Sequence, residues 1–203
     1  MKEGVMKVVF LLAACMSILA VALICIFLFA NGVPAIHKIG ITEFLFGQTW
    51  KPSNNIYGIF PMIIGSIYVT AGAVIIGVPM GILCAIFLAR FCPDKLYKIV
   101  KPAVSLLAGI PSIVYGLFGY LFFNIFLGWS YTILGGALTL AIMILPLIMR
   151  TTEEALIAVP DLYREGSFGL GAGKLRTVFR IVLPSAIPGI LAGVILAVGR
   201  IVG

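Results

Sequence analysis

The chain has 203 residues, of which 62% are hydrophobic and only 10% are charged, with a formal net charge of +7. Soluble globular domains carry about 25% charged residues, so this composition excludes a soluble domain and indicates an integral membrane protein. The apolar runs are long and lack the alternation of barrel strands, which predicts an all-α polytopic bundle of transmembrane helices. The basic residues are dispersed over short segments and do not form one face, which argues against nucleic-acid binding.

Residues 8–30 form the first predicted span, because a run of 23 residues without a charge follows a short basic start and about 20 apolar residues cross the hydrocarbon core. Residues 31–58 then carry aromatic side chains of the kind that settle at a membrane–water boundary, so an interfacial anchor is favoured over a binding site. This segment also holds His37, the single histidine in the sequence, which leaves little room for histidine catalysis or a histidine metal site.

The second predicted span, residues 59–89, has 31 residues and measures about 46 Å as a straight helix, so it must tilt, bend or begin in the interface. Small side chains recur in it at every fourth position. These residues are Ala73, Gly77, Gly81, Ala85 and Ala89. Such a stripe lets another helix approach closely, so we interpret it as a packing face.

Residues 90–101 carry four basic residues against one acidic residue, and three further spans are predicted at residues 103–126, 131–149 and 182–203. The last of these spans has a second stripe of small residues. They are Ser185, Gly189, Gly193 and Ala197. With this topology eleven basic residues lie on one side and two on the other, and one arginine near the C-terminus is unassigned. The positive-inside rule therefore places the N-terminus and the loop of residues 150–181 in the cytoplasm.

The loop of residues 150–181 is the longest polar segment and carries nine charged residues. Thr151 and Glu154 have the spacing of a capping box, Asp161 is expected to cap a second short helix, and Gly171 is expected to let the chain turn. The sequence therefore predicts a bent hydrophilic segment that is fixed at both ends to membrane helices and held by a partner outside the membrane.

This segment resembles the EAA loop of ABC-importer permeases, whose usual form is Glu-Ala-Ala, three residues, Gly, nine residues, Ile, one residue, Leu-Pro. The matching residues are Glu165, Gly166, Ser167, Gly171, Ile181, Leu183 and Pro184. Gly166 and Ser167 replace the two alanines but remain small. In that family the loop docks into a groove of a separate ATPase subunit, so the resemblance implies that these seven residues couple the chain to an ATPase. The alternative is a solvated amphipathic loop without a partner.

Other strings resemble the permeases of phosphate-specific Pst importers, and the C subunit more than the A subunit. They include Trp50-Lys51-Pro52, the run from Leu107 to Gly116, and Gly199-Arg200 with Gly203. This resemblance covers about residues 8–203, which we expect to form one transmembrane domain within residues 1–203. It implies passage of inorganic phosphate across the cytoplasmic membrane, with an ATPase, a second homologous permease and an extracytoplasmic phosphate-binding protein as partners. Because the family closes with a sixth helix, the sequence is expected to be truncated at its C-terminus.

Three residues are candidates for the substrate path. Arg200 lies in a predicted span, where a charge is costly unless it faces protein, water or a counter-charge, and its guanidinium suits phosphate. The alternative is that Arg200 reaches the outer interface. Ser112 and Tyr115 adjoin Gly109 and Pro111, so their hydroxyls either face the path at a broken helix or bond back to their own helix.

Several other functions are disfavoured by the sequence. The run Gly169–Leu175 looks like a phosphate-binding loop, but Phe168 and Leu175 stand where that motif needs glycine and a hydroxyl residue. The four cysteines lack the spacing of metal ligands, so we expect no metal. The predicted spans contain no paired carboxylates and no nucleophile with a base, so we also expect no catalytic residue and no cofactor. The remaining alternatives are a permease for another oxyanion such as sulfate or molybdate, an ATP-independent channel or secondary transporter, and a membrane scaffold that transports nothing.

Overall fold

The structure is a computed structural model that describes residues 2–202, and the chain divides into two compact units at the boundary between Ile64 and Gly65. Most described residues are helical. Within residues 2–202, four helical stretches are long and apolar enough to cross a membrane, and a fifth is added if two helices joined by a sharp bend count as one span. These findings confirm the predicted all-α class with about five spans.

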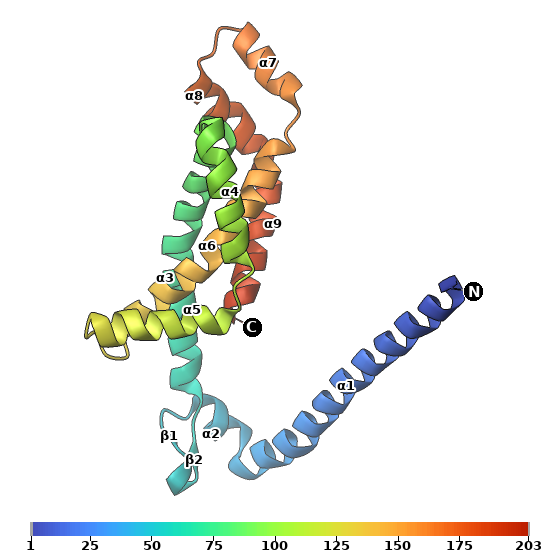
Figure 1. Cartoon of the computed structure of the whole chain (residues 1–203). Coiled ribbons are helices and arrows are strands. Elements are labelled where there is room, and N and C mark those ends of the chain that lie inside the picture. Colours follow the sequence, from blue (N-terminus) through green and yellow to red (C-terminus); the bar gives the residue numbers. More distant parts are fainter. Residues whose placement is uncertain (1, 203) are drawn as a thin grey trace. The chain divides into compact units, whose positions relative to one another are not determined.

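The first unit contains one long helix, one short helix and a small hairpin (Figure 1). They are α1 (Lys2–Ile39), α2 (Ile41–Phe46), β1 (Trp50–Lys51), the 3₁₀ turn η1 (Pro52–Asn54) and β2 (Ile56–Tyr57). Gly40 separates α1 from α2 at a φ of 95°, a conformation that glycine adopts without steric cost. Trp50 pairs with Tyr57 across the hairpin, and their rings meet edge to face with centroids 5.6 Å apart.

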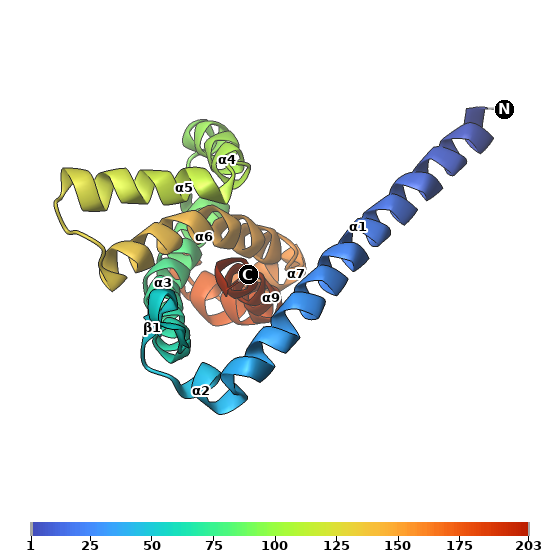
Figure 2. The same ribbon diagram turned by 90° about the horizontal axis from the view of Figure 1, so that it is seen from below.

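The second unit contains the remaining helices, three of which continue into a π-helical turn. In chain order the elements are α3 (Phe60–Ile86, whose first residues belong to the first unit), η2 (Phe87–Phe91), α4 (Asp94–Ala108), α5 (Ser112–Gly119), η3 (Tyr120–Phe126), α6 (Ile133–Ile157), α7 (Asp161–Gly169), α8 (Lys174–Thr177), η4 (Val178–Val182) and α9 (Leu183–Val202). Figure 2 shows α6 between α5 and α9, and α6 also packs against α4.

Both predicted stripes of small residues pack against α6. A Cβ added at Gly81 of α3 would lie 2.7 Å from Cγ2 of Ile148, and one added at Gly193 of α9 would lie 2.2 Å from the hydroxyl oxygen of Thr151. Real Cβ atoms do not approach other atoms so closely, so only glycine permits this packing. The stripes are therefore packing faces, as predicted, and they share α6 as their partner.

The predicted third span, residues 103–126, is not one straight helix. α4 and the helix formed by α5 and η3 meet at a bend of 94° around Gly109–Pro111. The hydroxyl of Tyr115 donates a hydrogen bond of 2.8 Å to the carbonyl oxygen of Leu107, across the bend. We call residues 109–111 the elbow. Pro111 cannot donate an amide hydrogen bond, which helps to end α4 here.

The predicted capping signals at Thr151 and Asp161 are wrong. α6 continues without a break to Ile157, and the Thr151 hydroxyl donates to the carbonyl of Leu147 one turn earlier in the same helix. Continuing the helix buries Thr152, Glu153 and Leu156 in its last two turns, so tertiary packing outweighs the local capping pattern. α7 begins after Pro160, and Asp161 pairs with Arg164 at 2.6 Å and caps no backbone amide.

Candidate functional site

The connection between α6 and α9, residues 158–182, is called the polar loop below. Within it α7 runs to Gly169, the chain reverses at Gly171 with a φ of 80°, and α8 leads through η4 into α9. The positive φ confirms the turn that the sequence predicted at Gly171. The loop thus consists of two short helices joined by a tight turn, as Figure 1 shows at α7 and α8.

Hydrogen bonds close the polar loop on itself. The hydroxyls of Ser167 and Thr177 lie 2.8 Å apart, and both side chains are buried. Thr177 also contacts the carbonyl oxygen of Gly173 at 3.2 Å, and the amide of Ala172 donates to the carbonyl of Ser167 at 3.1 Å. Because buried hydroxyls are stable only when hydrogen-bonded, this pair fixes α7 against α8 and makes the loop a defined body.

The seven residues matched to the EAA pattern occupy different parts of this body. Glu165 and Gly166 are exposed on α7, Ser167 is buried on its opposite face, and Gly171 forms the turn. Ile181, Leu183 and Pro184 lie where the loop enters α9. Ser167, Gly171 and Ile181 come together around a cavity of about 290 Å³, whereas Glu165 faces solvent. The pattern therefore marks both the inner contacts of the loop and its outer face.

Sequence reasoning missed the apolar side chains on the outside of the polar loop. Leu170 is 91% exposed, Leu162 74% and Leu175 65%. Large apolar side chains grouped on a segment rich in charge are typical of a surface that another protein covers. The signal was present as isolated leucines between charged residues, but their shared exposure depends on how α7 folds back on α8.

The base of the polar loop is fixed by a hydrophobic cluster and an arginine. Leu156 at the end of α6 and Val159 just beyond it pack with Val182 of η4 and with Ile86 at the end of α3. Arg90 in η2 donates a hydrogen bond to the carbonyl oxygen of Leu156, one of the last carbonyls of α6, which are left without a partner inside the helix. Both ends of the loop are thereby joined to the helix bundle.

A second cluster that the sequence did not indicate joins α4 to α6. Glu153, whose side chain is 8% exposed, accepts hydrogen bonds from the hydroxyl of Tyr97 at 2.5 Å and from Nζ of Lys101 at 3.1 Å. Nζ of Lys101 also donates to the Tyr97 hydroxyl at 2.5 Å. Tyr97 and Lys101 are four residues apart, so they lie on the same face of α4. We call these three residues the Glu153 cluster.

The three candidates for the substrate path lie at the elbow and at the end of α9. Tyr115 is buried with Ala197, and Ile201 packs against the same cluster, so the elbow lies beside the last turns of α9, as Figure 1 shows. Arg200 is half-buried in those turns, and Ser112 is exposed in the first turn of α5. The Tyr115 hydroxyl is engaged by Leu107, so its role is to brace the bend.

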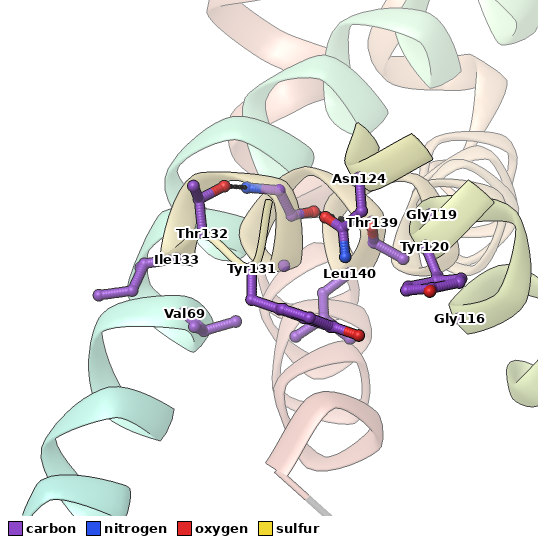
Figure 3. Close-up of a pocket in the computed structure, with 12 residues that line it drawn as sticks. Val69, Gly116, Gly119, Tyr120, Asn124, Tyr131, Thr132, Ile133, Thr139 and Leu140 are labelled. Carbon is purple, nitrogen blue, oxygen red and sulfur yellow. Dashed lines mark hydrogen bonds between the residues drawn. The ribbon is translucent and has the colours of Figure 1, made fainter. Parts of the chain in front are cut away.

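The sequence did not predict the cavity shown in Figure 3. It has a volume of about 520 Å³ and lies between α5, η3, the start of α6 and one residue of α3. Tyr120, Tyr131, Asn124 and Thr139 contribute polar atoms to its lining, and the rings of the two tyrosines stack with centroids 6.0 Å apart. Its lining contains no charged side chain, and it includes neither Arg200 nor the other two path candidates.

Comparison with known proteins identifies the family. Residues 77–203 match the model of the family described as "Binding-protein-dependent transport system inner membrane component". This match covers more than half of the chain, and the chain belongs to that family. It is therefore a multi-pass membrane protein of the ABC-importer permease class, which confirms the resemblance seen at the polar loop.

Individual relatives agree with this class. The chain is 34% identical over 200 residues to the "Probable ABC transporter permease protein YqgH" of Bacillus subtilis (strain 168), covering 94% of this chain and 65% of that protein. It is 35% identical over 205 residues to the "Phosphate transport system permease protein PstC" of Mesorhizobium japonicum, covering 89% of this chain and 62% of that protein. The chain therefore spans less than two thirds of the length of these relatives.

The fold is also similar to that of a solved transporter. A chain of the MetNI methionine ABC transporter, in an inward-facing conformation, superposes with a TM-score of 0.63 at 25% sequence identity. The similarity covers 71% of this chain and 73% of the other. The sequence relatives and the solved structure thus agree on a permease-type helical bundle.

Proposed function

We propose that this chain is a permease subunit of an ATP-driven importer and forms part of a path for inorganic phosphate across the cytoplasmic membrane. The family supports the permease class, and the similarity to a phosphate permease supports the substrate. The observation that carries the proposal is the polar loop: a body closed by the Ser167–Thr177 contact, joined to two membrane helices, with exposed leucines on its outside.

In this function the polar loop lies in the cytoplasm and docks on a separate ATPase subunit. Leu162 and Leu170 enter an apolar groove of the ATPase, and Glu165 and Gly166 line the same outer face of α7. Burying exposed apolar side chains is the main driving force of such association. Motion of the ATPase then moves α6 and α9, because the base of the loop is packed between them.

The phosphate path runs at the other end of α9. Arg200 lies 17 residues beyond Leu183, which is about 25 Å along a helix and nearly the thickness of the hydrocarbon core. The Arg200 guanidinium offers several donors to phosphate, and Ser112 offers a hydroxyl beside the elbow. A second homologous permease subunit completes the path, and an extracytoplasmic binding protein delivers phosphate to it.

Reconstitution tests this function directly. The full-length permease, assembled with its partner permease and ATPase in proteoliposomes, is expected to take up radiolabelled phosphate only when ATP and the binding protein are present. Sulfate and molybdate are measured in parallel. Uptake of either in preference to phosphate would overturn the substrate, and phosphate flux without ATP would indicate a channel or secondary transporter.

A substitution at Gly166 tests docking at the polar loop. An added Cβ at Gly166 meets nothing within 4 Å, so Gly166→Arg leaves the loop folded but places a long charged side chain on its outer face. We expect the ATPase to dissociate during purification and ATP-driven uptake to fall at least about tenfold. Gly166→Ala is the matched control, since it restores the usual alanine of the EAA pattern, and it should behave like the wild type. Normal uptake by Gly166→Arg would show that this face of α7 does not dock.

A further inference from the structure

Glu153 occupies an environment unlike that of the other acidic residues. Among the residues whose burial the structure describes, it is the one acidic residue in the buried class. Burying a carboxylate is costly unless it is paired and hydrogen-bonded, and here Tyr97 and Lys101 of α4 supply both requirements. The Lys101 side chain, by contrast, remains 49% exposed.

The Glu153 cluster connects the end of α6, which leads into the polar loop, with α4, which leads into the elbow. Glu153 is one turn before Ile157, the last residue of α6, and α7 begins at Asp161. Lys101 lies two turns before the end of α4 at Ala108, after which the chain enters the elbow. The cluster is thus a direct contact between the helix that carries the loop and the helix that leads to Ser112.

The chemistry of this contact favours joint movement of α4 and α6. If α6 moved away from α4, the buried Glu153 carboxylate would lose its two donors, and leaving a buried charge unpaired is strongly unfavourable. A cavity of about 140 Å³ lies beside Lys101 and Glu153.

The neighbouring pair of Arg150 and Glu154 provides a comparison. Its Nε and carboxylate oxygen are also 3.1 Å apart, but both side chains are more than half exposed and both belong to α6. A contact within one helix transmits nothing to a second helix, and an exposed pair is weak. Two adjacent glutamates therefore differ in their partner helix and in burial.

We infer that Glu153 is a positioning residue for transport, which makes α4 and the elbow follow α6 when the ATPase moves the polar loop. The inference rests on the proposed function and adds to it how movement of the polar loop reaches the proposed phosphate path. Without the Glu153 contact, the polar loop still docks and ATP is still hydrolysed, but the movement no longer reaches the elbow.

The experiment measures phosphate taken up per ATP hydrolysed by the full-length permease in its complete complex in proteoliposomes. For Glu153→Gln, we expect assembly and ATP hydrolysis within about twofold of the wild type and uptake per ATP lower by at least about tenfold. The matched control Glu154→Gln should leave this ratio unchanged. A purely structural role would instead lower ATP hydrolysis and uptake in proportion through loss of assembled complex.

Three further variants keep the test decisive if Glu153→Gln fails to assemble. Lys101→Met removes the same ion pair from its half-exposed side and should also lower uptake per ATP. Lys101→Glu combined with Glu153→Lys should restore at least part of the ratio that Lys101→Glu alone loses, because the exchanged charges pair again. An unchanged ratio in Lys101→Met, with ATP-driven uptake intact in the wild type, overturns the inference alone. Absence of ATP-driven uptake in the wild type overturns the proposed function, and the inference falls with it.

Discussion

The side of α6 that faces α3 and α9 differs from the side that faces α4 in the kind of contact it makes. Toward α3 and α9 the contacts are steric: Gly81 accommodates Ile148, and Gly193 accommodates Thr151. Toward α4 a buried carboxylate, a phenol and an ammonium meet through hydrogen bonds of 2.5–3.1 Å. Steric fit therefore holds α6 against α3 and α9, whereas a few directional hydrogen bonds hold it against α4.

This difference divides the second unit into a close-packed trio and an arm. The helices α3, α6 and α9 interlock through small residues, and close-packed interfaces of this kind resist gradual deformation. The arm consists of α4 and α5 joined at the elbow, and a brace from Tyr115 to Leu107 holds the angle between them. Within the arm, α5 also packs closely against α6, since a Cβ added at Gly119 would lie 2.1 Å from the hydroxyl oxygen of Thr139. The contact of α4 with α6 is polar, so α4 can change position in discrete steps while the trio stays intact.

The largest effect is expected where the trio is closest. In Gly193→Ala the new methyl group would lie 2.2 Å from the Thr151 hydroxyl oxygen, so α9 must move away from α6. Overpacking of this kind costs up to about 3 kcal/mol of the free energy of unfolding, and we expect a lower unfolding midpoint and less assembled permease. Thermal unfolding in detergent measures the midpoint, and the yield of purified complex measures assembly.

The control for this prediction is Gly199→Ala in the same helix. A Cβ at Gly199 meets nothing within 4 Å, and alanine has the higher helix propensity, so its midpoint should equal or slightly exceed that of the wild type. If both variants unfold at the wild-type temperature, α9 does not approach α6 as closely as described, and the division into trio and arm fails.

A smaller effect is expected at the brace of the arm. Tyr115→Phe keeps the buried ring but removes the hydroxyl that donates to Leu107, which is worth about 1 kcal/mol. The amides around the elbow should then exchange with solvent about fivefold faster, as hydrogen exchange measures. Tyr131→Phe is the control, because Tyr131 is 84% exposed. Loss of phosphate uptake in Tyr115→Phe with unchanged exchange would instead assign the hydroxyl to the substrate.

Much of the trio was predictable from the sequence, and most of the arm was not. A small residue at every fourth position is a local property of one helix, so the packing stripes through Gly77 and Gly189 could be recognised without their partner. That both stripes pack against α6 depends on the tertiary arrangement of the helices, which the pattern within one helix does not give. Glu153 lies next to Glu154 in the same polar run, and only the approach of α4 distinguishes a buried glutamate from an exposed one.

The site shows the same limit. The EAA spacing identified the polar loop, because five of its seven positions are identical in this chain and all lie within one continuous segment. The pattern of Thr151 and Glu154 wrongly predicted the start of a helix. A hydroxyl residue followed three positions later by glutamate also occurs inside a helix, where the hydroxyl bonds back to its own turn. The angle at the elbow and the cavity beside Tyr131 depend on packing between segments, which local patterns do not encode.

The smallest expected effect sharpens the distinction between contacts within a helix and contacts between helices. Arg150→Gln removes the ion pair with Glu154, but both side chains are exposed and both belong to α6. The free energy of unfolding should change by at most about 0.5 kcal/mol, and uptake per ATP should stay at the wild-type value. A clear drop in that ratio, with the unfolding midpoint unchanged, would mean that exposed charges at this end of α6 take part in coupling. The Glu153 cluster would then be one of several connections between the polar loop and the elbow, and α4 would not depend on it alone.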